Sequence, residues 1–290
     1  MNEDTNLSWK TKRRRGRMRF AHISDTHILR DNLSGEMGKL FSQLSDPKEK
    51  LSLVLEDIRC SGADFVLITG DMVHEGDAED YRVLREILDM GLGDIPYFVA
   101  LGNHDMKPAF YQGFLGEEPK ESWHGIWEWR GLRIILADSA IPGSEHGSFT
   151  EEQTEFLVEA LQSRSERGTL LAFHHPVLWS MKAFEMQIEV RLRSALQQSD
   201  VIGIFCGHTH ENRMMQMNGL TQYVAGSTAF GLKVLGEEIH FTDQAEYLLY
   251  DLDEEGRISV HAESIWPKID KRVRFQLKEF QAAMENLTET

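Results

Sequence analysis

Five short polar motifs each follow an apolar run, and this arrangement limits the fold of the chain more than any other sequence feature. The apolar runs have the length and composition of buried strands, which places the motifs in the loops that follow. In an open α/β sheet, such loops converge on one crevice at the carboxyl ends of the strands. The sequence therefore predicts an α/β protein in which the motifs meet. They are Asp25-Thr26-His27, Gly70-Asp71, Gly102-Asn103-His104-Asp105, Phe173-His174-His175 and Gly207-His208-Thr209-His210.

The first part of the chain alternates predicted strands and helices. Helices are expected where apolar residues recur at helical spacing, and strands where short apolar runs end in turns. This β-α-β-α-β order predicts parallel strands with helices packed on them. The expected strands cover 18–24, 64–69, 95–101, 132–137, 169–173, 201–205, 220–225, 247–252 and 258–262, and the expected helices cover 47–60, 78–90, a stretch from 150 to 161 and one near 185–197.

Three segments are expected along the chain. Residues 1–17 form a basic flexible tail, residues 18–266 form one domain, and residues 267–290 form an amphipathic helix that caps the site, packs on the body or joins a dimer. For the tail, an anchor to an anionic surface and a nucleic-acid arm stay open as alternatives. Residues 107–123 are expected to be the least structured, with exposed aromatic side chains.

Composition excludes several function classes. The net charge of −16 argues against extended nucleic-acid binding, because such acidity repels a phosphate backbone. A small anionic substrate stays compatible if metal ions supply local positive charge. No apolar stretch approaches the length of a membrane span. Cys60 and Cys206 give no disulfide framework and favour a reducing cytoplasm.

The motifs offer oxygen and nitrogen ligands. Asp25 and His27 lie two residues apart at a strand end and so project to the same side. A carboxylate directly behind a buried strand, such as Asp71, is costly unless it is paired or bound to a metal. Its two oxygens make Asp71 a natural bridge between two ions. His208 and His210 likewise share one side of an extended segment.

The remaining motif residues divide between ligands and other roles. Asn103 offers a neutral oxygen ligand and His174 a further imidazole, which leaves His104 free for acid–base work. His175 is expected to face away and to be structural, and His22 to be a packed histidine of the first strand. His104 and His146 are the predicted substrate contacts, with His74 a weaker candidate than His146.

Two metal ions would favour phosphoryl transfer, since they can clamp both the attacking and the leaving oxygen. We expect a metal-bound hydroxide to attack phosphorus in line while His104 protonates the leaving oxygen.

The order of these motifs resembles the calcineurin-like metallophosphoesterases over about residues 19–226. It is most similar to the bacterial class III cyclic-nucleotide phosphodiesterase branch, which also contains glycerophosphodiesterases. Supporting stretches are Gly70 to Gly76, Asp138-Ser139, Pro142-Gly143, His146-Gly147 and His174-His175-Pro176.

The resemblance implies a fold, a ligand set and cofactors. The fold would be a four-layer α/β/β/α sandwich of two mixed β-sheets flanked by helices. The ions would be iron with manganese or zinc, or two manganese ions. One ion would be held by Asp25, His27, Asp71 and His210, and the other by Asp71, Asn103, His174 and His208.

The leading functional hypothesis is a phosphodiesterase acting on small diesters, with 3′,5′-cyclic nucleotides as the first guess. A phosphomonoesterase or a pyrophosphate-cleaving hydrolase on the same site is the alternative, and a nuclease is disfavoured by the acidic charge. A non-catalytic protein-binding scaffold is the remote alternative, opposed by the complete ligand set and by His104. The expected partner is a small phosphodiester, the location is cytoplasmic, and a homodimer is left open.

Overall fold

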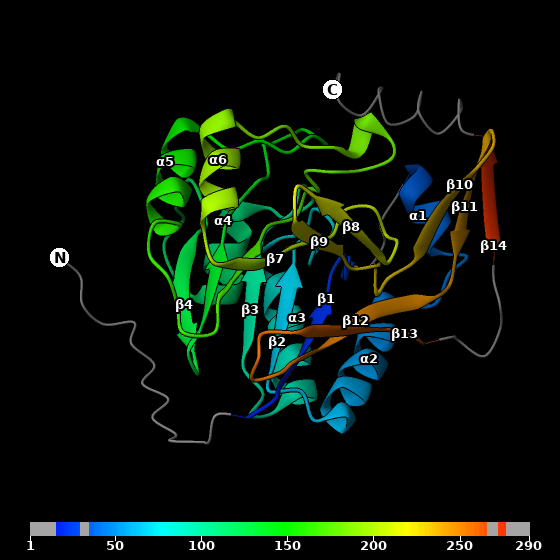
Figure 1. The fold of residues 1–290 in the computed structure, drawn as a ribbon. Helices are drawn as coiled ribbons and strands as arrows, with labels where there is room; N and C mark the ends of the chain where they lie inside the picture. The colour runs from blue at the N-terminus through cyan, green and yellow to red at the C-terminus, as the bar shows by residue number, and fades with distance from the viewer. Residues whose placement is uncertain (1–15, 30–34, 266–271, 277–290) are drawn as a thin grey trace.

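The computed structural model describes residues 16–29, 35–265 and 272–276, and two large sheets form its centre (Figure 1). The first sheet has the order β13-β12-β1-β2-β3. Its strands are β1 (Met18–Ile23), β2 (Phe65–Thr69), β3 (Tyr97–Ala100), β12 (Ala245–Leu252) and β13 (Ile258–Ile265). β1, β2 and β3 are parallel, as the β-α-β-α-β pattern predicts, whereas β12 pairs antiparallel with β1 and with β13.

The second sheet has the order β4-β5-β6-β7-β9-β8. β5, β6, β7 and β9 run parallel, and β4 and β8 close the two edges in antiparallel pairs. Both sheets are therefore mixed. The strands are β4 (Gly125–Trp129), β5 (Leu132–Leu136), β6 (Thr169–Ala172), β7 (Val201–Cys206), β8 (Arg213–Met217) and β9 (Leu220–Val224).

Apolar side chains from both sheets form one core cluster between them. Phe20 and Phe65 of the first sheet belong to the same buried cluster as Ile134 and Phe205 of the second. The outer face of the first sheet is covered by α2 (Pro47–Ser61) and α3 (Ala78–Leu92), and that of the second by α5 (Glu151–Ala160) and α6 (Val190–Gln198). The predicted four-layer sandwich of two mixed sheets flanked by helices is confirmed.

α2, α3 and α5 begin within one residue of their predicted starts, whereas α6 begins at Val190 rather than near residue 185. The Thr150 hydroxyl accepts from the Gln153 amide at the start of α5, and the Gln153 side chain accepts from the Thr150 amide. The capping box expected from the sequence is therefore present. α3 starts with an equivalent box between Asp77 and Asp80. Within the described residues, no helix combines the length and the apolar character needed to cross a membrane.

A third, small sheet lies beside α1 (Gly35–Phe41) and corrects the predicted C-terminal helix (Figure 1). It pairs β10 (Gly231–Leu235) with β11 (Glu238–Thr242), and β11 with β14 (Arg272–Gln276). The helix expected over 267–290 is therefore wrong for residues 272–276. There Val273 and Phe275 alternate with polar residues, and this strand period prevails because the edge of β11 supplies backbone partners. The rest of that segment and the basic tail up to residue 15 lie outside the described residues.

Residues 107–123 are more ordered than the sequence predicts. They contain α4 (Lys107–Ala109) and a π-helical stretch, η1 (Phe110–Leu115), whose aromatic side chains are buried. A Cβ at Gly113 would collide with the carbonyl of Ala78 in α3, so this glycine allows close packing rather than marking a loop. The aromatic side chains of η1 are buried by this packing, so the expectation that they are exposed is wrong. A short 3₁₀ helix, η2 (Lys182–Phe184), precedes α6.

Candidate metal centre

The five motifs meet at one edge of the sandwich, as their positions after strands predict. The first sheet supplies those that follow β1, β2 and β3, and the second sheet those that follow β6 and β7. Backbone bonds join neighbouring loops: the Asp25 and His27 amides donate to the carbonyls of Gly70 and Asp71, each at 3.0 Å. The Gly207 amide donates to the His174 carbonyl at 2.9 Å. The loops thus continue the sheet pairing beyond the strands.

Five of the seven predicted ligands have a left-handed backbone. For a residue with a Cβ this conformation costs about 1–2 kcal/mol. Such strain persists where the surroundings enforce it, and it clusters at functional sites. The φ angles are 52° at Asp25, 38° at His27, 48° at Asp71, 73° at His208 and 54° at His210.

Glycines let the carboxylates approach the backbone of neighbouring loops. A Cβ at Gly102 would collide with Oδ1 of Asp71, and one at Gly207 would collide with Ser24 and crowd Asp25. In the space that Gly207 leaves, the His208 amide donates to Oδ2 of Asp25 at 3.0 Å. The glycines of these motifs are therefore needed for ligand placement.

Asp25, His27 and His210 form the first ligand group. Nε2 of His210 lies 3.2 Å from Oδ1 of Asp25 and 3.1 Å from Nε2 of His27. Nδ1 of His210 must carry its proton, because it lies 3.0 Å from the Phe230 carbonyl, which can only accept. In the neutral ring, Nε2 then points a lone pair at the carboxylate. A cation between these atoms relieves the repulsion.

Asp71 and His174 repeat this arrangement in the second group. Nδ1 of His174 donates to the Thr69 carbonyl at 2.7 Å, so in the neutral ring its Nε2 presents a lone pair 3.1 Å from Oδ2 of Asp71. The same Oδ2 lies 3.9 Å from Nε2 of His27. The Asp71 carboxylate thus stands between the two groups, as a bridging ligand would. The His208 ring is 5.1 Å from the His174 ring.

Unpartnered buried atoms indicate that the site suits cations. Among the described residues, Asp25 Oδ1, Asn103 Oδ1 and His174 Nε2 are buried without a hydrogen bond. The two oxygens are acceptors, as is the nitrogen when the imidazole is neutral, and an unsatisfied buried acceptor costs about 1–3 kcal/mol. The nitrogen and oxygen donors and this unmet demand fit divalent metal ions.

The pKa values of His174 and His208 also indicate that the site attracts positive charge. Burial opposes protonation of His174, but the Asp71 carboxylate outweighs it and raises the pKa of His174 to about 10. Burial and the charge of His174 together lower the pKa of His208 to about 3. The protein atoms alone therefore attract positive charge to one place in the cluster, which a metal ion can supply in place of a proton.

His104 lies at the margin of both groups. Its backbone amide donates to Oδ1 of Asp71 at 2.8 Å. Its Nδ1 is 3.5 Å from Oε1 of Glu75, and its Nε2 is 3.8 Å from Oε2 of Glu145. Burial opposes protonation, but Asp71, Glu75 and Glu145 raise the pKa of His104 to about 9. The imidazole is only partly buried, so it can reach a substrate.

The other histidines take different places. His146 is exposed, its amide donates to Ser144 Oγ at 3.0 Å, and it belongs to neither ligand group. His74 is buried with its Nδ1 3.2 Å from Nδ1 of His27, so it contacts a predicted ligand rather than solvent. His22 is packed, as predicted, with Nε2 2.8 Å from Thr69 Oγ1.

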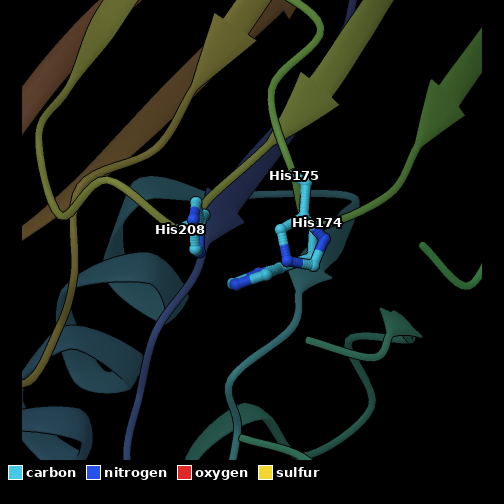
Figure 2. A group of neighbouring side chains, drawn as sticks. All are labelled: His174, His175 and His208. Carbon is cyan, nitrogen blue, oxygen red and sulfur yellow. The ribbon is translucent and has the colours of Figure 1, made fainter. Parts of the chain in front are cut away.

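His175 departs from its predicted orientation. Figure 2 shows His174, His175 and His208 as neighbouring side chains, and the His175 ring lies 4.6 Å from the His208 ring. The expectation that His175 faces away from the cluster is therefore wrong. Its Nδ1 lies 2.8 Å from Ser139 Oγ, which anchors the ring to the loop after β5.

Comparison with known proteins identifies the family. Residues 18–212 match the family described as calcineurin-like phosphoesterase. The chain belongs to this family. A probable cyclic nucleotide phosphodiesterase of Rhodococcus erythropolis is 32% identical to this phosphoesterase over 220 residues, which is 73% of the present chain and 71% of the relative.

Two further comparisons bear on substrate and fold. A glycerophosphodiester phosphodiesterase of Enterobacter lignolyticus is 27% identical over 223 residues, covering 70% of the present phosphoesterase and 75% of the relative. The crystal structure of a dimetal phosphatase from Danio rerio superposes with a TM-score of 0.56 at 13% identity, covering 86% and 98% of the two chains. The last likeness supports the fold. The family and these phosphodiesterase relatives support a hydrolytic enzyme.

Sequence reasoning missed three acidic residues of this phosphoesterase site. Glu75 and Glu145 flank His104, and Asp105 accepts from the Gly102 amide at 2.9 Å and from the Tyr81 hydroxyl at 2.8 Å. Asp105 is the last residue of the motif Gly102-Asn103-His104-Asp105, so its position in the sequence could have indicated a role in the site. Glu145 had no such signal, because its contact with Asn103 spans 42 residues.

Proposed function

We propose that the protein is a dinuclear metal-dependent phosphodiesterase that hydrolyses small phosphodiesters, with 3′,5′-cyclic nucleotides as the first substrates to test. One observation carries the proposal: buried acceptor atoms of two ligand groups face one another across the shared carboxylate of Asp71. Two cations would satisfy these acceptors and leave net positive charge for a phosphate ester.

The proposed ligand set follows the two groups. Iron with manganese or zinc, or two manganese ions, suits these nitrogen and oxygen donors. His27, His174 and His210 each have Nδ1 next to a protein atom, which directs Nε2 toward the centre. One ion would be held by Asp25, His27, Asp71 and His210, and the other by Asp71, Asn103, His174 and His208.

The chain's own contribution to catalysis is orientation and proton transfer. The two ions, when bound, would supply the activated water and the Lewis acidity of the reaction. His104 would protonate the leaving oxygen, since it is partly exposed beside Asp71 and has a carboxylate near each ring nitrogen. The carboxylates of Glu75 and Glu145 favour the protonated form of His104. His27 and His174 are buried, which keeps bulk water away from that part of the site.

Hydrolysis of bis(p-nitrophenyl) phosphate with added manganese tests the reaction class. We expect activity that depends on manganese and disappears with a chelator. Absence of hydrolysis at every metal loading would reject the enzyme proposal and favour the scaffold alternative.

A substrate panel at fixed manganese tests the substrate class. Cyclic AMP and cyclic GMP come first because the Rhodococcus erythropolis relative is described as a probable cyclic nucleotide phosphodiesterase. Glycerophosphodiesters are the second candidate because the Enterobacter lignolyticus relative is named for them. Monoesters and pyrophosphates complete the panel. A higher kcat/KM for any of these other classes would replace the cyclic-nucleotide assignment.

Location and assembly are part of the proposal. A cytoplasmic site of action fits cyclic nucleotides as substrates, and Cys206 is buried as a free thiol. A homodimer is checked by light scattering of the full chain.

A further inference from the structure

Asn103 can serve as a metal ligand only if its amide is held in one of two orientations. The oxygen of a carboxamide can bind a cation, whereas its nitrogen carries two protons and cannot. The two ends have nearly the same shape, so a neighbouring group must select between them. This requirement distinguishes Asn103 from the carboxylate ligands, which present an oxygen in either orientation.

Glu145 makes the contact that selects the orientation. Nδ2 of Asn103 donates to Oε2 of Glu145 at 2.8 Å, and an ionised carboxylate can only accept. The bond is charge-assisted and therefore stronger than a neutral one. Oδ1 of Asn103 is then left buried and, among the described residues, without a hydrogen-bond donor.

The loop that presents Glu145 is fixed at both ends. Its bridge pairs Ala140 with Gly147, and Lys107 binds the carbonyl of Ala140 at 3.1 Å and the carboxylate of Asp138 at 2.7 Å. The Ala140 amide donates to the same Asp138 carboxylate at 3.0 Å. Glu145 therefore reaches Asn103 from an anchored turn.

We propose that Glu145 is a positioning residue, which holds the Asn103 amide so that its oxygen faces the second metal ion. This inference rests on the proposed dinuclear function. It adds a residue outside the five motifs to the construction of the site. Ligand-orienting contacts of this kind typically contribute 10–100-fold to metal affinity.

A charge effect must be separated from the orienting bond, because Glu145 also lies 3.8 Å from Nε2 of His104. Glu75 offers the matched control. It places a carboxylate 3.5 Å from Nδ1 of the same imidazole, and no hydrogen bond joins it to Asn103 among the described residues. Glu75→Gln therefore removes a comparable charge and leaves the amide contact intact.

The experiment is calorimetric titration of the metal-free full chain with Mn²⁺, which reports the number of ions and the affinity of each. We expect Glu145→Ala to weaken one ion about 10–100-fold and to leave the other unchanged. Glu145→Gln retains an acceptor oxygen and should recover most of the affinity, and Glu75→Gln should bind each ion with the affinity of the wild type. Melting of each metal-free variant checks its fold. If the alanine variant does not fold, Glu145→Leu supplies the variant without an acceptor.

Two results would overturn the inference. Wild-type affinity for both ions in Glu145→Ala would show that Asn103 needs no orienting partner. Equal losses in Glu145→Gln and Glu145→Ala would assign the effect to charge. Failure of the proposed function would give a different result, because the wild type itself would bind fewer than two ions or hydrolyse no diester. That result would also reject the inference about Glu145.

Discussion

At the scale of single residues, Asp71 is the side chain on which both proposed metal ions would depend. Its Oδ2 lies 3.1 Å from Nε2 of His174 and 3.9 Å from Nε2 of His27. Asp71→Ala removes the shared carboxylate, so we expect the loss of both ions, measured by elemental analysis of the purified variant. Asp251→Asn is the control, because it alters a buried carboxylate of β12 that contacts none of the proposed ligands. Retention of two metal ions per chain by Asp71→Ala would reject the bridging role.

His104 should behave as an acid rather than as a ligand. His104→Ala is expected to lower kcat about 10²–10⁴-fold, the usual contribution of a positioned general acid. Metal content should be unchanged. His146→Ala is a useful comparison, since His146 is exposed and belongs to neither ligand group. A metal-depleted His104→Ala variant would mean that the imidazole binds an ion.

At the scale of secondary structure elements, an ion pair joins the first strand to a strand from the end of the chain. Arg19 of β1 and Asp251 of β12 are register partners and form two hydrogen bonds, at 2.8 and 2.9 Å. The Arg19 hydrogen bonds outweigh burial and hold the pKa of Asp251 well below its usual range. Arg17 adds a further contact to the same carboxylate.

This pair gives a pH-dependent stability. Because the folded-state pKa of Asp251 is depressed, the stabilisation is complete above the unfolded pKa of about 3.9 and is lost as pH falls toward the folded value. Asp251→Asn should lower the free energy of unfolding by about 1.5–3 kcal/mol at pH 7. Urea denaturation of both proteins at pH 7 and near pH 3 checks this, and the difference should shrink at the lower pH. Glu79→Gln, at an exposed pair with Arg82, should have little effect at either pH.

The elements that the sequence predicted are those with a strong local pattern. β2, β6 and β7 are short apolar runs between turns, and the polar motifs behind them fall where parallel strands end. The ligand candidates could be found because each stands directly after such a run.

What could not be predicted depends on contacts between distant parts of the chain. β14 forms against β11, and the alternation of Val273 and Phe275 is too short to outweigh the helical spacing of the longer segment when the sequence is read alone. The order within residues 107–123 depends on the close packing of Gly113 against α3, which joins segments far apart in the sequence. The contacts of Glu145 with Asn103 and of His74 with His27 join residues more than 40 positions apart.

At the scale of the whole molecule, the proposed ions would join the two sheets. Asp25 and Asp71 follow strands of the first sheet, and His174 and His210 follow strands of the second. Ligand binding to the folded state adds about 2.7 kcal/mol of stability per site at a concentration 100 times the dissociation constant. We therefore expect manganese to raise the melting temperature and a chelator to reverse it, measured by calorimetry. Asp71→Ala should not respond. An unchanged wild-type melting temperature would mean that the ions do not join the sheets.

The left-handed backbone at five predicted ligands has a consequence for metal selectivity. Backbone bonds between loops hold Asp25, His27 and Asp71, and the His208 amide donates to the Asp25 carboxylate, so these positions are set when the protein folds and their ordering does not weaken ion binding. Ligand positions that are set before an ion binds have little freedom to move closer together or farther apart around it. Ionic radius, rather than a preference for one type of donor atom, should then decide which metals the protein accepts.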